Sequence, residues 1–142
     1  MSPRELFHKP ETKRLSLSDD QWVEVKAGLN AGDARRMDSL AVKPLKLEDG
    51  TVVDRIDWSM YEFERDALWI TDWSFSRQDS SGKVYPIPVS VAALQALDLD
   101  VFNELNDSVF SHIMQWIGSK GPRRTTEGTL QAAVNASPTS AS

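Results

Sequence analysis

Residues 69–75 read Trp-Ile-Thr-Asp-Trp-Ser-Phe, and a turn signal follows at residues 79–83, which read Asp-Ser-Ser-Gly-Lys. Three large aromatic side chains therefore lie within seven positions, shortly before a place where the chain reverses. The rings either form the packed end of a core element or belong to a surface that meets a partner. The residues on both sides of this stretch predict a fold class, but they do not decide between these two explanations.

The residues before this stretch predict a helix that ends within it. Apolar residues recur at steps of four, three, four and three, the spacing of one helix face, at Ile56, Met60, Phe63, Ala67 and Ile70. Asp54 is suited to cap the N-terminus, because its side chain can accept a hydrogen bond from a free backbone N–H. The face opposite the apolar stripe is expected to contact solvent and carries Glu62, Arg65 and Asp66.

The N-terminal third predicts a β-hairpin and a short helix. Apolar and polar residues alternate over 13–18 and again over 21–26, which is the period of a half-buried strand, and the Ser-Asp-Asp sequence between them is typical of a turn. Asn30 or Asp33 begins a short helix, which a proline at position 44 stops. Residues 43–54 contain few apolar side chains and predict a loop, with a brief strand at 51–53.

Two more helices are predicted in the C-terminal half. Two prolines keep residues 85–89 extended, and Ser90 then caps a short helix. Asp98 or Asp100 begins a longer helix, which Gly118 is expected to end. The apolar face of this longer helix carries Val101, Phe102, Leu105, Val109, Ile113 and Trp116.

Together these signals predict a single α+β domain over residues 1–118, in which an N-terminal β-hairpin is followed by three or four helices, so that the domain is mainly α. Residues 119–142 contain only two large apolar side chains, Leu130 and Val134, among mostly small and polar residues. Such a segment cannot bury enough apolar surface to offset the entropy of ordering it. We therefore expect a disordered, low-complexity C-terminal tail.

The composition excludes several classes of protein. The chain has 16 Lys and Arg against 21 Asp and Glu, and its net charge of −5 disfavours nucleic acid as a partner. It contains no cysteine, which rules out disulfides and thiolate metal sites. No apolar run approaches the roughly 20 residues that a membrane-spanning helix needs. We expect a soluble protein of the cytosol with no membrane partner.

No group of residues carries an enzyme signature. His8 and His112 are the whole supply of bases near neutral pH, and His112 is interpreted as a half-buried packing residue beside the apolar face of the last helix. The acidic residues near the central helix have the spacing of its solvent-facing side and its ends: Asp54, Asp57, Glu62, Glu64, Asp66 and Asp72. A small hydrolase that uses them would lose activity on Asp57→Asn or Asp66→Asn, but we expect no enzymatic activity, no metal and no cofactor.

Aromatic side chains are then the candidates for a partner-binding surface: Trp58, Trp69, Trp73, Phe75, Phe102 and Trp116. Such rings bring a large contact area at low entropy cost, which is why they concentrate at interfaces. Trp69, at the helix end, is expected to close the core. Trp73 and Phe75 lie beyond it and are the stronger candidates for partner contact, so replacing both by Ala is expected to leave the thermal midpoint of unfolding within a few degrees.

Several short motifs occur in a recognisable order: Trp-Val-Glu-Val at 22–25, Leu-Asn-Ala-Gly-Asp at 29–33, Ile-Thr-Asp-Trp-Ser-Phe at 70–75, Gly-Lys at 82–83 and Pro-Ile-Pro-Val-Ser at 86–90. This order, which spans roughly residues 10–117, resembles the tail assembly chaperones of long-tailed siphophages. The insert at 43–50, Lys-Pro-Leu-Lys-Leu-Glu-Asp-Gly, and the second proline, Pro88, depart from the pattern of that family.

The resemblance implies a bacteriophage protein without enzymatic activity that binds the tape measure protein and recruits tail tube subunits during tail morphogenesis. It also implies a place in the host cytoplasm and absence from the mature virion. An aromatic patch on an acidic protein agrees with this role, because a long helical rod such as the tape measure protein needs temporary cover for its apolar faces. The alternative is a structural tail or neck component that stays in the virion. Self-association is open in both cases.

Overall fold

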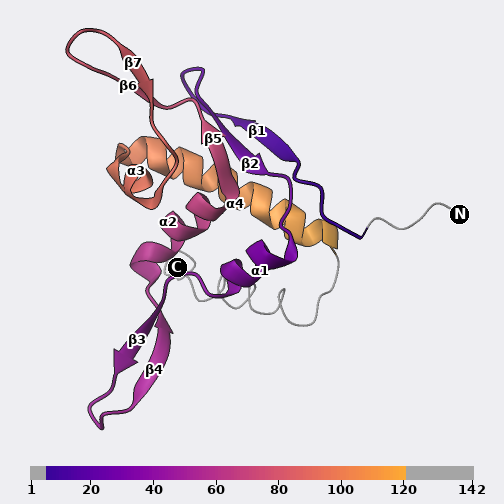
Figure 1. Cartoon of the computed structure of the whole chain (residues 1–142), viewed down its shortest axis with the longest axis vertical. Helices are drawn as coiled ribbons and strands as arrows, with labels where there is room; N and C mark the ends of the chain where they lie inside the picture. Colours follow the sequence, from indigo (N-terminus) through magenta and orange to yellow (C-terminus); the bar gives the residue numbers. More distant parts are fainter. Residues whose placement is uncertain (1–5, 121–142) are drawn as a thin grey trace, which may run out of the picture.

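The computed structural model describes residues 6–120, which form four helices and seven strands (Figure 1). In chain order the elements are β1 (Thr12–Ser16), β2 (Trp22–Lys26), α1 (Ala31–Asp38), β3 (Val42–Lys46), β4 (Val52–Ile56), α2 (Trp58–Trp69), β5 (Ile70–Trp73), β6 (Ser76–Gln78), β7 (Val84–Pro86), α3 (Val91–Ala96) and α4 (Leu99–Lys120). Residues 1–5 and 121–142 lie outside the described part, and so does nearly all of the predicted tail.

The fold is α+β, but the expectation of a mainly α domain with one hairpin is wrong. Helices hold 42% and strands 26% of the described residues. The strands form a three-stranded antiparallel sheet in the order β1-β2-β5 and two separate hairpins, β3–β4 and β6–β7. These two hairpins extend from opposite ends of the body (Figure 1). Most of their side chains are exposed on both faces, so their residues lack the apolar alternation by which a half-buried strand is recognised in a sequence.

The start of the central helix differs from the expected position. Asp57 rather than Asp54 caps α2, and its side chain accepts a hydrogen bond from Ser59 N–H at 3.1 Å. Ile56, which the apolar stripe assigned to the helix, belongs to β4 instead. Residues 43–54, for which we predicted a loop, form most of the β3–β4 hairpin. The brief strand predicted at 51–53 overlaps only the beginning of β4.

The other predicted helices are present. Asn30 caps α1 and Ser90 caps α3, each by accepting a backbone N–H of the first turn. Gly118 does not end α4, which continues to Lys120. One glycine inside a helix costs only about 1 kcal/mol relative to alanine, and a helix of this length tolerates that cost.

The N-terminal hairpin is present as predicted, and its turn has an uncommon backbone. Asp19 and Asp20 both have positive φ angles, 58° and 59°. Gln21 N–H donates to the Ser18 carbonyl at 3.1 Å. This is a type I′ turn, whose twist matches that of the flanking strands, and Asp tolerates the left-handed region better than most residues. The hairpin therefore reverses tightly.

The core lies between the three-stranded sheet and helices α2, α3 and α4. Its buried side chains are Val23, Val25, Leu29, Met37, Trp69, Ile70, Trp73, Leu94, Phe102, Leu105, Val109 and Ile113. Trp69 is fully buried among them, with its ring edge-on to those of His112 and Trp116 at centroid distances of 5.6 and 5.4 Å. Trp69 thus closes the core, as expected.

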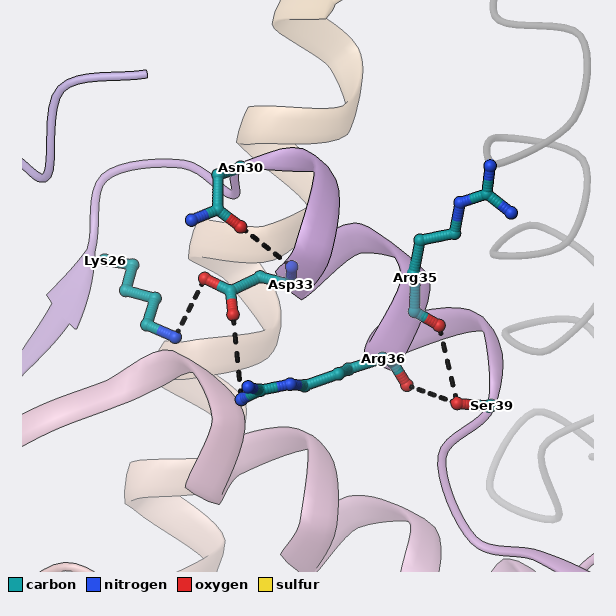
Figure 2. A network of polar contacts seen from close by, with 6 residues as sticks. All are labelled: Lys26, Asn30, Asp33, Arg35, Arg36 and Ser39. Atoms are coloured by element: carbon teal, nitrogen blue, oxygen red, sulfur yellow. Dashed lines mark hydrogen bonds and ion pairs between the residues drawn. The ribbon is translucent and has the colours of Figure 1, made fainter. Parts of the chain in front are cut away.

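Charged side chains fasten α1 to the end of β2 (Figure 2). Lys26 Nζ lies 3.1 Å from Asp33 Oδ2, and Arg36 Nη1 lies 3.9 Å from Asp33 Oδ1. At the other end of the helix, the Ser39 hydroxyl lies 3.3 and 3.4 Å from two carbonyl oxygens of the last turn. Of these contacts, only that of Lys26 with Asp33 joins this helix of eight residues to the sheet, whereas the others lie within α1 and its C-terminal cap.

Candidate partner-binding groove

The six aromatic candidates do not form one exposed surface. Trp69, Trp73 and Phe102 are buried in the core, whereas Trp58, Phe75 and Trp116 are half-buried at three different places. The Trp58 ring packs on that of Tyr61 in a second, small cluster at the base of the β3–β4 hairpin. The Trp116 ring packs on Trp69, and the Phe102 ring packs on Phe63 at a centroid distance of 4.8 Å. The expected exposed aromatic patch is therefore absent from the described residues.

Trp73 in particular does not lie on the surface, which corrects its interpretation as an exposed partner contact. It is only 4% exposed. Its indole N–H donates to the backbone carbonyl of Ile87, and its ring lies 5.1 Å from that of Phe75. β5 begins directly where α2 ends and pairs with β2, so that Trp73 stands opposite Val23 and points into the core. The sequence could not reveal this, because the pairing partner lies 50 residues away.

Phe75, by contrast, lines a groove with a volume of about 650 Å³. The groove runs between the β1–β2 turn, the segment that joins β5 to β6, and the first turns of α4. Its apolar lining consists of Leu17, Phe75, Ile87, Leu97 and Val101. These side chains are all half-buried, so they present part of their apolar surface to the groove.

The rim of the groove is acidic, and hydrogen bonds hold one of its carboxylates, that of Glu104, in place. Asp19, Asp100 and Glu104 stand around it. Glu104 Oε1 accepts the backbone N–H of Ser18 at 3.1 Å, and Glu104 Oε2 accepts the Ser18 hydroxyl at 2.6 Å. These bonds hold the pKa of Glu104 below its usual value, so the carboxylate is charged at neutral pH. The turn and α4 are therefore linked across the groove, although the linked residues lie 86 positions apart.

A charged pair is buried between α2 and α4 and does not line the groove. The expectation that Arg65 and Asp66 face solvent is wrong, since Asp66 is 0% exposed and Arg65 is also buried. Arg65 Nη2 donates to Asn106 Oδ1 at 2.6 Å and lies 3.1 Å from Asp66 Oδ1. Burial raises the pKa of Asp66 to about 7, against the opposing effect of the Arg65 charge. α4 covers a face of α2 that carries charged residues, for which the sequence predicts contact with solvent. The residues near this face in the sequence do not reveal that α4 packs against it.

His112 is engaged in packing. Its Nε2 lies 2.7 Å from the Lys26 carbonyl oxygen, and its ring meets the edge of Trp69. This contact ties α4 to the end of β2. Within residues 6–120, no three His, Asp or Glu side chains are gathered so that they could hold a metal ion. No helix in the same part of the chain is long and apolar enough to cross a membrane.

The groove is the feature of the described residues that best fits a binding role, because it combines an apolar floor with a charged rim in which Glu104 is held by hydrogen bonds. Phe75 is the one aromatic candidate that lines it. The chain matches no protein-family model, no curated protein and no solved structure.

Proposed function

We propose that this protein is a phage tail assembly chaperone that binds an amphipathic helix of the tape measure protein in the groove. The observation that carries the proposal is the groove itself, in which an apolar floor around Phe75 and Val101 is bordered by carboxylates. A helix binds such a groove by inserting apolar side chains at positions i, i+3, i+4 and i+7. The resemblance to siphophage tail assembly chaperones supplies the identity of the partner.

The charges of the rim specify the kind of helix. Asp19, Asp100 and Glu104 lie at the edge of the apolar floor, so a helix whose apolar stripe is flanked by Lys or Arg complements them. The net charge of −5 for the whole chain acts in the same direction by attracting a basic segment. An acidic segment is disfavoured by the same charges.

The groove is also pre-organised. Two sets of hydrogen bonds hold the walls of the groove before any partner arrives. Ser18 bonds to Glu104, and the Ser74 hydroxyl accepts Trp22 N–H at 2.8 Å. Binding then orders few additional groups of this protein, which lowers the entropic cost of association. A pre-formed groove suits a chaperone that covers successive apolar faces of a long helical rod and releases them as assembly proceeds.

The rest of the proposed role follows the resemblance: the protein acts in the host cytoplasm, recruits tail tube subunits to the covered tape measure protein, has no enzymatic activity, and is missing from the mature virion. The alternative is a structural tail or neck component. The two projecting hairpins favour that alternative, because arms of this kind are suited to contacts between neighbouring subunits of an assembly.

The test is co-expression of the full chain with the tape measure protein of the same phage, followed by pull-down. Val101→Arg places a cation in the apolar floor and is expected to abolish capture. Asn103→Arg adds the same charge to an exposed position of the same helix and serves as the matched control, which is expected to bind like the original chain. Capture that is equal for both variants would refute the groove as the binding site.

An inventory of mature particles by mass spectrometry separates the two roles. Absence from the particle, together with capture of the tape measure protein, supports the chaperone. Presence at a fixed copy number supports the structural component and would contradict the proposal.

A further inference from the structure

The β3–β4 arm, which we define as residues 42–56, exposes an unusual amount of apolar surface. Its exposed large apolar side chains are Val42, Leu45, Leu47, Val52 and Val53, half of all such side chains in the described residues. Val52 is 61% exposed and Val53 is 39% exposed. The arm extends away from the body (Figure 1) and meets it mainly at its base, where Ile56 packs on the small Tyr61 cluster. An isolated two-stranded hairpin is only marginally stable in water, so this arm gains from being covered.

The hydrogen-bonding pattern shows which backbone groups of the arm are directed outward. At its base Asp57 N–H donates to the Ala41 carbonyl, and at its tip Leu47 N–H donates to the Thr51 carbonyl, both at 2.8 Å. Antiparallel pairs alternate between bonded and non-bonded, so the odd-numbered residues of the arm bond across the hairpin. The even-numbered residues therefore direct their backbone N–H and C=O groups away from it. On β4 these are Val52, Asp54 and Ile56.

Only one of the two edges is open to another strand. On β3 the outward residues are Val42, Pro44 and Lys46, and Pro44 has no N–H to donate. Pro44 stands directly opposite Asp54, so the centre of the β3 edge is blocked where the centre of the β4 edge is free. A strand can therefore add to β4 but not to β3.

We propose that β4 pairs antiparallel with β4 of a second copy of this chain, so that two arms form one four-stranded sheet. Because the β3 edge is blocked on both arms, the sheet cannot grow further, and the assembly closes as a two-fold symmetric dimer rather than a filament. This interface is separate from the groove, and the inference does not rest on the proposed function.

The charges of β4 select one register. When two copies of β4 pair antiparallel, a residue whose backbone groups point outward must stand opposite another such residue. The two-fold axis of the pair then passes beside one residue of β4, and the register is named after that residue. Centring on Asp54 opposes two carboxylates, and centring on Arg55 opposes two guanidinium groups. Centring on Val52 pairs the strand with the turn that precedes it. Centring on Val53 opposes no like charges within β4 and pairs Val52 with the Asp54 of the second copy.

The register centred on Val53 also covers the exposed apolar side chains. Leu45 is the cross-strand neighbour of Val53 within one arm, and its side chain is 36% exposed. In the four-stranded sheet these residues form a continuous apolar row, in which Leu45 and Val53 of one copy meet Val53 and Leu45 of the other. Self-complementarity of this kind is a property of a two-fold interface, which is why we choose a second copy over a foreign strand as the occupant.

The first test uses disulfide cross-linking, to which the chain is suited because it contains no cysteine. Across a non-hydrogen-bonded pair the two Cα atoms lie about 4.5 Å apart, within disulfide reach, so Val53→Cys is expected to form a covalent dimer on mild oxidation. Leu45→Cys is the matched control, because its two copies would be separated by three strand spacings, about 14 Å, which no disulfide spans. Equal cross-linking of both variants, or of neither, would overturn the proposal.

The second test measures the oligomeric state of the full chain by sedimentation equilibrium. The original chain is expected to be a dimer. Asp54→Pro removes one outward N–H at the position that faces Pro44 and is expected to weaken the dimer by about 100-fold, since it deletes hydrogen bonds across the two-fold axis and inserts a ring there. Lys46→Pro makes the same change on the edge that is already blocked, and it is expected to leave dimerisation intact. Circular dichroism of both variants checks that each remains folded.

A monomeric original chain, or a dimer unaffected by Asp54→Pro, would refute the β4 interface. Val101→Arg, the groove variant, is expected to dimerise normally. Failure of the groove proposal and failure of the dimer proposal are therefore distinguishable.

Discussion

Gly28 and Gly118 offer a paired test of how α4 is built and packed. A Cβ atom on Gly28 would lie 2.5 Å from Trp116 Nε1, closer than Cβ atoms approach other heavy atoms, and 3.0 Å from Trp116 Cδ1, which is a tight contact. The indole of Trp116 also packs on the buried ring of Trp69, which restricts how it can move. Gly28→Ala therefore forces the last part of α4 to shift against the sheet. A Cβ on Gly118 meets nothing within 4 Å.

The expected magnitudes have opposite signs. Overpacking of this kind costs about 1–3 kcal/mol, and 1 kcal/mol moves the thermal midpoint of a domain of this size by about 3–6 °C, so Gly28→Ala is expected to lower the midpoint by several degrees. Gly118→Ala is expected to stabilise the protein by about 0.5–1 kcal/mol, because alanine loses less conformational entropy in a helix than glycine does.

Differential scanning calorimetry of the two variants and the original chain measures both effects. An unchanged midpoint for Gly28→Ala would show that Trp116 does not pack on this glycine. A lower midpoint for Gly118→Ala would show that the residue ends the helix in a left-handed conformation, where a Cβ is unfavourable, and would refute the continuation of α4 to Lys120.

Three further expectations follow from the buried and linked side chains. Trp73→Ala is expected to destabilise the protein by about 3–5 kcal/mol in urea unfolding, and the half-buried Phe75→Ala by clearly less; equal small effects would place Trp73 on the surface after all. The folded-state pKa of Asp66 is raised from 3.8 to about 7, so the folded state binds the extra proton between these values and stability is lost as pH rises through this window. The free energy of unfolding, compared with that of Asp66→Asn, is therefore expected to fall between about pH 4 and pH 7 and to stay level above it, whereas parallel curves would contradict a buried carboxyl. Ser18→Ala removes the hydroxyl bond to Glu104 and is expected to speed amide hydrogen exchange in the β1–β2 turn, and unchanged exchange would mean that this link does not hold the groove.

Much of the local structure could be predicted from residue patterns. The caps at Asn30 and Ser90, the first hairpin with its Asp-rich turn and the apolar face of α4 are all present. These features depend on hydrogen bonds and side-chain spacing within a few residues of chain, and so a short window contains all the information that determines them.

The β3–β4 arm was missed for a related reason. Its strands are exposed on both faces, so nothing forces apolar and polar residues to alternate, and Pro44 argued against a strand at all. Proline is tolerated there because its position faces outward from the hairpin, a fact that depends on the pairing register with β4.

The candidate site was within reach of the sequence only in part. Residue patterns singled out Phe75, which lines the groove, but they could not separate it from Trp73, whose ring is buried, or recognise that Asp66 lies in the interior. The sequence by itself determined where the chain forms most of its helices, its first hairpin and its turns. The tertiary structure decided which aromatic ring is covered and which carboxylate is desolvated. These properties depend on contacts between residues far apart in the sequence, such as that of Ser18 with Glu104, whose partners lie 86 residues apart and meet only in the folded protein.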